Sequence, residues 1–215
     1  MQASRFPVHR HKQSGFTLIE IAIVLVIIGL LLGGILKGQE LINSARVKNL
    51  ATDFRNIPLF IYGYQDKFKA LPGDDPAVVA HVSGTLATNG TQGNGAIEGN
   101  WNSTTAGDES FLFWQHVRLA GLAPGPTSTG AGDYRPLNSV GGFLGIQSSV
   151  PITGMSGTYF ICSAGILGKF VKQLDSQLDD SNTAAGSMMA SSTLPTPIET
   201  ASIVDSTTYT VCMGI

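Results

Sequence analysis

Charged residues are scarce in this 215-residue chain. Only 13% of the residues are Asp, Glu, Lys or Arg, whereas 43% are hydrophobic, which leaves room for one membrane segment and one soluble domain of ordinary size. The first fifteen residues contain no acid and three bases, Arg5, Arg10 and Lys12. Residues 16–215 contain ten basic and fifteen acidic side chains. This acidic balance argues against a nucleic-acid partner.

Residues that commonly perform catalysis are also few. Two of the four histidines lie in the basic leader, and neither a G-x-S-x-G nor an H-E-x-x-H motif occurs. The glycine-rich run at 93–100, GNGAIEGN, lacks the lysine and the strand-loop-helix context of a phosphate-binding loop. We therefore expect no enzymatic activity and no cofactor.

Cysteine is limited to Cys162 and Cys212. Two cysteines 50 residues apart suit one disulfide in an exported domain, between the strand expected at 158–165 and the last strand, 206–215. In the chain-entropy model, closing such a loop contributes about 4 kcal/mol. Two buried free thiols are the alternative. Metal binding by these cysteines is not expected, because no Cys-x-x-Cys or histidine cluster accompanies them.

The longest apolar run, residues 16–36, is interrupted only by Thr17, glycines and Glu20. At about 1.5 Å per residue, a helix of this length crosses a hydrocarbon core of about 30 Å. An unpaired carboxylate within such a helix costs about 2.5 to 3.5 kcal/mol, so Glu20 needs a partner or a task. No A-x-A site follows the run, and cleavage before it would keep the membrane helix on the mature protein.

The sequence KQSG followed by FTLIEIAIVLVIIGLL resembles the processing site and N-terminal helix of type IV prepilins and type II secretion pseudopilins. The resemblance implies that a prepilin peptidase removes the leader, 1–15, by cutting between Gly15 and Phe16. Phe16 would then be N-methylated. The resemblance also implies that Glu20 pairs with the N-terminus of a neighbouring subunit. The alternative is that Glu20 lies at the lipid headgroups, favoured by the helix dipole.

Glycines weaken the second half of the apolar helix by about 1 kcal/mol each relative to alanine. Type IV pilins commonly carry a helix-breaking proline in this part, whereas this chain has glycines and a lysine: Gly29, Gly33, Gly34, Lys37 and Gly38. Two interpretations remain open. The glycines favour local loss of helicity in an assembled filament, or they permit close packing of neighbouring helices.

From Lys37 to Leu71 the pattern becomes amphipathic. Apolar residues recur at spacings of four and three, which predicts a helix with one stripe packed against a sheet: Leu50, Phe54, Ile57, Ile61, Tyr64 and Phe68. The opposite face is expected to meet solvent or other subunits: Arg46, Asp53, Arg55, Asp66 and Lys67. Pro58 is expected to interrupt and bend the helix. The sequence ALPGDDP then ends it, and this exit segment also resembles pilin-like proteins.

The remaining residues, 72–215, are expected to form a globular head. A polar, glycine-rich stretch at 82–107 predicts a long surface loop that Ile97 and Trp101 partly order. Helices are predicted from Glu109 through the sequence FLFWQHVRLAGL and at 167–178. Strand candidates are 141–150, 158–165 and 206–215, with 184–192 as a fourth, and together they predict a small antiparallel sheet.

Two features of the head have a simple and a functional interpretation. His116 has no partner at ligand spacing and is predicted to be a surface or boundary residue. Asp175, Asp179 and Asp180 are candidate calcium ligands because they bring carboxylate oxygens together at 175–180. The simpler interpretation is that these aspartates cap the preceding helix and turn the chain.

Together these features predict an α+β pilin fold, in which a long N-terminal helix, half of it membrane-spanning, packs against a small antiparallel sheet. The expected function is a structural subunit of a type IV pilus-like filament. Its expected partners are further copies of the chain, prepilin peptidase, the inner-membrane pilus assembly machinery and, before assembly, membrane lipid.

Two alternatives remain open. One is a pseudopilin or minor pilin of a type II secretion or DNA-uptake machine, and the other is a membrane-tethered binding or adhesion protein that does not polymerise. Bases flank the apolar run on both sides, so orientation rests on the leader resemblance and the expected disulfide. We expect an inner-membrane, single-pass precursor with its head outside the cytoplasm, and then an extracellular filament.

Overall fold

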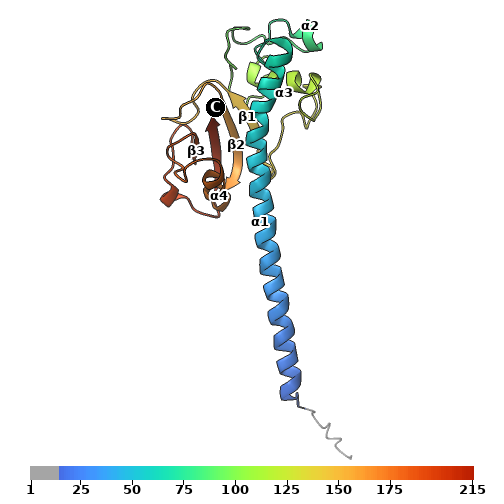
Figure 1. Cartoon of the computed structure of the whole chain (residues 1–215), viewed down its shortest axis with the longest axis vertical. Helices are drawn as coiled ribbons and strands as arrows, with labels where there is room; N and C mark the ends of the chain where they lie inside the picture. Colours follow the sequence, from blue (N-terminus) through green and yellow to red (C-terminus); the bar gives the residue numbers. More distant parts are fainter. Residues whose placement is uncertain (1–14) are drawn as a thin grey trace, which may run out of the picture. The chain divides into compact units, whose positions relative to one another are not determined.

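A computed structural model describes residues 15–215 of the chain, so the predicted leader lies outside the described residues except for Gly15. The chain divides into two compact units, Met1–Ile42 and Asn43–Ile215. Figure 1 shows the helices and strands along the sequence. The two units are described in turn.

The first unit contains the beginning of helix α1, which runs from Leu18 to Phe68. Its apolar side chains are exposed: Leu18 is 93% exposed and Leu30 is 73% exposed. Among the described residues, α1 is the one helix that is long and apolar enough to cross a membrane. Apolar surface on all sides of a helix indicates lipid or other apolar helices as its surroundings. The segment therefore suits a membrane anchor of a precursor.

In the second unit, α1 buries one side only. The predicted stripe is confirmed at five positions, since Leu50, Phe54, Ile57, Ile61 and Tyr64 are all buried. The stripe's last member, Phe68, is half-buried at the end of the helix.

Pro58 does not interrupt α1, so the predicted interruption was wrong, whereas the predicted bend stays a prediction. Proline removes one N–H donor, the one that would have bonded the carbonyl of Phe54, and its ring crowds that carbonyl. Two members of the stripe that flank Pro58 along the helix, Ile57 and Ile61, are each only 1% exposed. Burial of these neighbours holds the backbone helical across the missing bond.

Four short strands form one antiparallel sheet: β1 (Leu144–Gln147), β2 (Phe160–Leu167), β3 (Met188–Ser191) and β4 (Thr208–Gly214). The spatial order is β1-β2-β4-β3, so the C-terminal strand β4 lies between β2 and β3 (Figure 1). Three of the four predicted strand segments contain one of these strands, and the segment at 158–165 overlaps β2, which continues to Leu167. Together with α1 they form the α+β architecture of the predicted pilin fold.

The other helices are α2 (Val78–Val82), α3 (Glu109–Leu119) and α4 (Gly168–Leu178), and a 3-10 turn, η1, covers Thr200–Ser202. One apolar core joins the stripe of α1 to the sheet and to α3. Its members include Phe54 from α1, Leu112 from α3 and Val211 from β4. This core includes alternate residues of the strands, and apolar residues between them belong to a second, smaller apolar cluster.

The predicted long loop contains neither helix nor strand over residues 83–108. It is nevertheless held in place, because Ile97 is fully buried and Trp101 is 8% exposed. Its glycine-rich part also donates backbone N–H groups to the carboxylate of Asp74, from Gly93 and, at 2.7 Å, from Gly95. The loop therefore closes over the segment that ends α1.

Cys162 and Cys212 form a disulfide. The two residues lie directly opposite each other on β2 and β4, and both are fully buried in a second apolar cluster that also contains Trp101 and Met189. The bond joins neighbouring strands across a separation of 50 residues. It therefore ties the C-terminal strand into the middle of the sheet.

Candidate functional site

The predicted processing segment lies at the start of α1. Phe16 is 85% exposed, and Thr17 directly precedes the first helical residue. The carboxylate Oε2 of Glu20 accepts hydrogen bonds from the backbone N–H of Thr17 at 2.8 Å and from its hydroxyl at 2.7 Å. The N–H of Glu20 donates back to the Thr17 hydroxyl at 3.3 Å. This reciprocal pair is a capping box, which fixes where the helix begins.

The capping role of Glu20 was not predicted from the sequence, although the sequence signal of a capping box is present. Thr17 and Glu20 have the spacing of the capping box, a threonine followed three residues later by a glutamate. Both hydrogen bonds that Glu20 accepts use one oxygen, Oε2. Cleavage after Gly15 would place a new amine one residue before this cap. Neither the cleavage site nor the assembly role of Glu20 is tested by this geometry, and both stay predictions.

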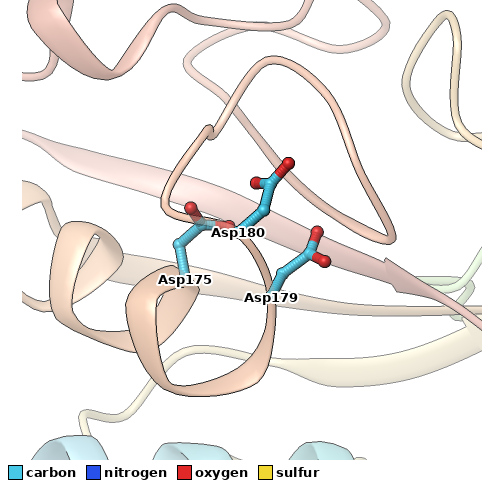
Figure 2. A group of neighbouring side chains, drawn as sticks. All are labelled: Asp175, Asp179 and Asp180. Atoms are coloured by element: carbon cyan, nitrogen blue, oxygen red, sulfur yellow. The ribbon is translucent and has the colours of Figure 1, made fainter.

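The predicted calcium ligands do come together (Figure 2). One carboxylate oxygen from each of Asp175, Asp179 and Asp180 lies within 4.8 Å of the others. Burial, together with the negative charges of Asp179 and Asp180, raises the pKa of Asp175 to about 6. Calcium binding at this cluster stays a prediction, which the last subsection of the Results takes up.

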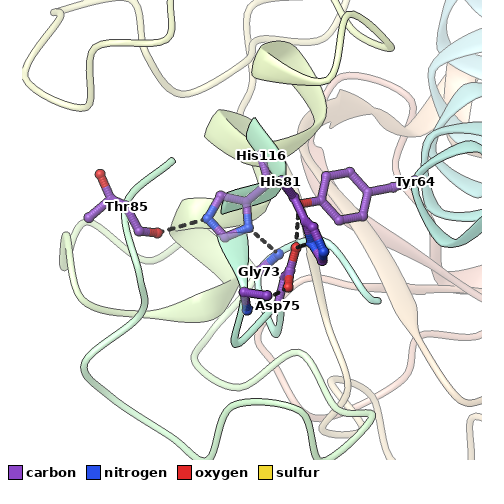
Figure 3. Close-up of polar contacts among 7 residues, drawn as sticks. Tyr64, Gly73, Asp75, His81, Thr85 and His116 are labelled. Carbon is purple, nitrogen blue, oxygen red and sulfur yellow. Dashed lines mark hydrogen bonds and ion pairs between the residues drawn. The ribbon is translucent and has the colours of Figure 1, made fainter. Parts of the chain in front are cut away.

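A polar network joins the end of α1 to the segment that follows it (Figure 3). Asp75 has a buried carboxylate whose Oδ2 accepts a hydrogen bond from the Tyr64 hydroxyl at 2.8 Å and lies 2.7 Å from Nδ1 of His81. Its other oxygen accepts the N–H of Ala77 at 2.8 Å. Burial alone would raise the pKa of Asp75, but the hydrogen bonds from His81, Tyr64 and Ala77 bring it below its ordinary value. Asp75 is therefore ionised at neutral pH.

His116 contradicts its prediction as a surface or boundary residue, because it is fully buried. The N–H of Gly73 donates to its Nδ1 at 2.9 Å, so Nε2 must carry the proton that bonds the Thr85 carbonyl, also at 2.9 Å (Figure 3). Burial lowers the pKa of His116, which favours this neutral form. The ring thus joins the segment after α1 to the start of the long loop and is structural.

The Asp75–His81 pair borders a surface pocket of about 560 Å³. Phe68, Lys69 and Tyr159 also line it, but none of its lining residues is serine, threonine or cysteine. An aspartate–histidine pair activates a nucleophile only when a hydroxyl or thiol lies within reach of the imidazole. Among the described residues that line the pocket, the pair has no hydroxyl or thiol nucleophile to activate, and its hydrogen bonds hold the chain after α1 in place.

Two further acids, Asp53 and Glu109, each have a buried carboxylate oxygen. Asp53 was predicted to face solvent or neighbours, but its Oδ2 is buried without a hydrogen-bond partner in the described residues, and burial raises its pKa to about 6. Glu109, in the first turn of α3, is fully buried. Its Oε2 accepts the N–H of Glu98 at 2.8 Å. Burial raises the pKa of Glu109 to about 7, and the charges of Asp74 and Glu98 also raise it.

The Asp75 network predicts a measurable contribution to stability. Replacing Asp75 with asparagine removes the buried negative charge to which Tyr64, Ala77 and His81 bond. We expect a loss of about 2 kcal/mol in the free energy of unfolding. Tyr64→Phe removes one of those bonds and should cost about 1 kcal/mol. The measurement is guanidinium unfolding of the full chain in detergent, followed by the fluorescence of the two buried tryptophans.

A double variant supplies the internal control, since both substitutions remove the Tyr64–Asp75 bond and should cost less together than separately. Asp66→Asn is the matched surface control, because Asp66 pairs with Lys69 where both side chains are largely exposed. It should change stability by less than about 0.5 kcal/mol. Equal effects of Asp75→Asn and Asp66→Asn would contradict the role of the network.

Glu109 predicts a pH dependence with a definite sign. Its pKa is raised on folding from 4.5 to about 7, so between these values the native state holds a proton that the unfolded chain releases. Stability is therefore lost as the pH rises through this window. Glu109→Gln removes the loss and should stabilise the chain at pH 8 by about 1 to 3 kcal/mol, with a smaller gain at pH 5.

Unfolding titrations at the two pH values make this measurement, with the exposed Glu199→Gln as the control that should show no pH-dependent difference. A gain in stability for Glu109→Gln that is the same at pH 5 and pH 8 would refute the assigned cause. A gain that came from better packing alone would not depend on the protonation of Glu109.

Residues 10–36 match the family described as the prokaryotic N-terminal methylation motif. No curated protein and no solved structure matches the chain. The matched residues include the Gly15–Phe16 junction, the capping pair of Thr17 and Glu20, and the first part of α1. The chain therefore carries, at residues 10–36, the prepilin-type methylation signature of type IV pilins and pseudopilins.

Proposed function

We propose that this protein is a structural subunit of a type IV pilus-like filament. After cleavage between Gly15 and Phe16 the subunit waits in the inner membrane with its head outside the cytoplasm, and it then assembles with further copies through α1. The observation that carries the proposal is the methylation motif on an apolar helix with one acid, Glu20, near its start.

Two properties of the N-terminal segment support assembly through α1. The side chains at 16–36 are exposed in the isolated chain, so their apolar surface is available to lipid first and to other copies of α1 afterwards. Cleavage would also create an α-amino group on Phe16, with an ordinary pKa of about 7.7 to 8, which retains its charge capacity when it is methylated. An amine of a neighbouring copy is therefore a suitable partner for a carboxylate in an apolar setting.

The capping box refines how Glu20 would act. In the isolated chain its Oε2 is engaged by Thr17, which satisfies part of the carboxylate and orients it at the first turn of α1. We propose that Oε1 accepts the hydrogen bond of the neighbouring Phe16 amine, while Thr17 keeps the side chain in position. Pairing of opposite charges would offset the cost of about 2.5 to 3.5 kcal/mol for an acid within the membrane.

The head supports a pilus subunit over a pseudopilin. A disulfide between β2 and β4 suits an exported domain, and the loop at 83–108 adds a large polar surface to the second unit. We therefore propose that the mature filament is extracellular, with the inner-membrane pilus assembly machinery as its builder.

The test is incorporation of Glu20→Ala into filaments. Removing the carboxylate should reduce incorporation by about tenfold or more, because loss of about 1.4 kcal/mol at each subunit contact lowers the association constant tenfold. Glu20→Gln keeps the shape and the cap but not the charge, and it should show most of the same defect. Purified surface filaments and membranes are compared by quantitative immunoblot.

Glu40→Ala is the matched control, since Glu40 also lies on α1 and pairs with Lys37 in an exposed ion pair. It should assemble normally while its level in the membrane stays unchanged. Normal incorporation of Glu20→Ala would contradict the pairing mechanism, and absence of the wild-type protein from filaments would contradict the proposed function itself.

A further inference from the structure

The end of α4 presents three carboxylates to one another. Asp175 lies in the last turn of the helix, and Asp179 and Asp180 directly follow it. One oxygen from each lies within 4.8 Å of the other two (Figure 2). Three negative charges at this separation repel one another unless a proton or a cation lies between them.

Asp175 provides a second, independent observation. Its side chain is only 2% exposed, and neither carboxylate oxygen has a hydrogen-bond partner within the described residues. Buried carboxylates are normally paired or bound to a metal, because an unpartnered one costs several kcal/mol. Among residues 15–215 no ion pair involves any of the three aspartates, and Lys172 of the same helix pairs instead with Asp205.

The backbone around the cluster is arranged so that the carboxylates stay together. The N–H of Asp179 donates to the Asp175 carbonyl at 2.7 Å, and Oδ2 of Asp179 accepts the N–H of Met188, the first residue of β3, at 2.8 Å. Gly186 has a φ of +89°, and a Cβ there would lie 2.2 Å from the same Asp179 oxygen. A glycine at 186 thus leaves room for the Asp179 carboxylate.

We propose that Asp175, Asp179 and Asp180 bind a divalent cation, and that calcium is the cation that fits. Calcium takes six to eight oxygen ligands at about 2.3 to 2.6 Å, in flexible geometry, and accepts waters where the protein supplies few. Two oxygens on opposite sides of such an ion lie about 5 Å apart, which agrees with the separation in the cluster. Asp180 is exposed, so the open side of the site is available to water.

Binding would strengthen the connection between the end of α4 and the start of β3. The cation would link the end of α4 to the start of β3, because Asp179 already bonds Met188. β3 pairs with β4, whose Cys212 is bonded to β2. The cation would therefore stabilise the outer strand of the sheet. This inference is independent of the proposed filament function.

The test is thermal unfolding of the full chain in detergent with about 5 mM calcium chloride, against the same protein in excess chelator at matched ionic strength. For a site with a dissociation constant of about 0.1 to 1 mM, we expect calcium to raise the midpoint by about 3 to 8 °C. Magnesium at the same concentration should give a smaller shift, because it demands shorter bonds and more regular geometry.

Variants test whether the calcium-dependent rise of the unfolding midpoint comes from the three aspartates. Asp175→Asn keeps the shape of the side chain, and Asp180→Asn changes an exposed side chain whose Oδ1 accepts the N–H of Asn182, a bond that asparagine can keep, so we expect at least one variant to fold. Both should lose most of the calcium shift. Asp205→Asn, beside the same helix but paired with Lys172, is the matched control and should keep it. No calcium shift in the wild type, or an equal shift in all variants, would overturn the proposal.

Discussion

Covering the apolar surface of α1 is the constraint on which the rest of the chain depends. One helix from Leu18 to Phe68 changes from apolar on all sides to apolar along one stripe. The stripe is covered by the protein itself, in a core shared by α1, α3 and the sheet. Within residues 15–215 the first part has no such cover, and this difference motivates the proposal that lipid and then other subunits supply it.

The polar features of the head follow from how α1 ends. Once the helix stops, the chain must turn back over the core without leaving polar groups unsatisfied. Asp75 and His116 accomplish this by bonding groups from three segments, and the glycine-rich loop completes the arrangement by surrounding Asp74. The pocket beside Asp75 is thus a consequence of chain closure.

Local patterns in the sequence predicted the elements well. The spacing of the α1 stripe, the alternating strands and the helices at α3 and α4 depend on periodicities of a few residues, and the structure confirms them. Contacts between distant segments could not be predicted in this way. His116 appeared to be a surface residue because its partner Gly73 lies 43 residues away. Asp53 was assigned to solvent because helical periodicity does not show which loops cover the opposite face.

The N-terminal segment also had one feature that was predicted from the sequence and one that was not. Its residues predicted the processing motif, and the match at residues 10–36 agrees with that prediction. The capping pair of Thr17 and Glu20 was also encoded locally but was overlooked, because the acid was considered only as a charge in a membrane. Glu20 therefore has one task in the isolated chain and a second, proposed task between subunits.

The central claim is that the apolar segment is both an anchor and an assembly element, made ready by cleavage at one bond. Intact-mass and N-terminal mass spectrometry of the mature protein tests it most directly. The account predicts a chain that begins at Phe16 with one methyl group on its α-amine. A chain that still carries its leader, or that begins beyond Glu20, would contradict it.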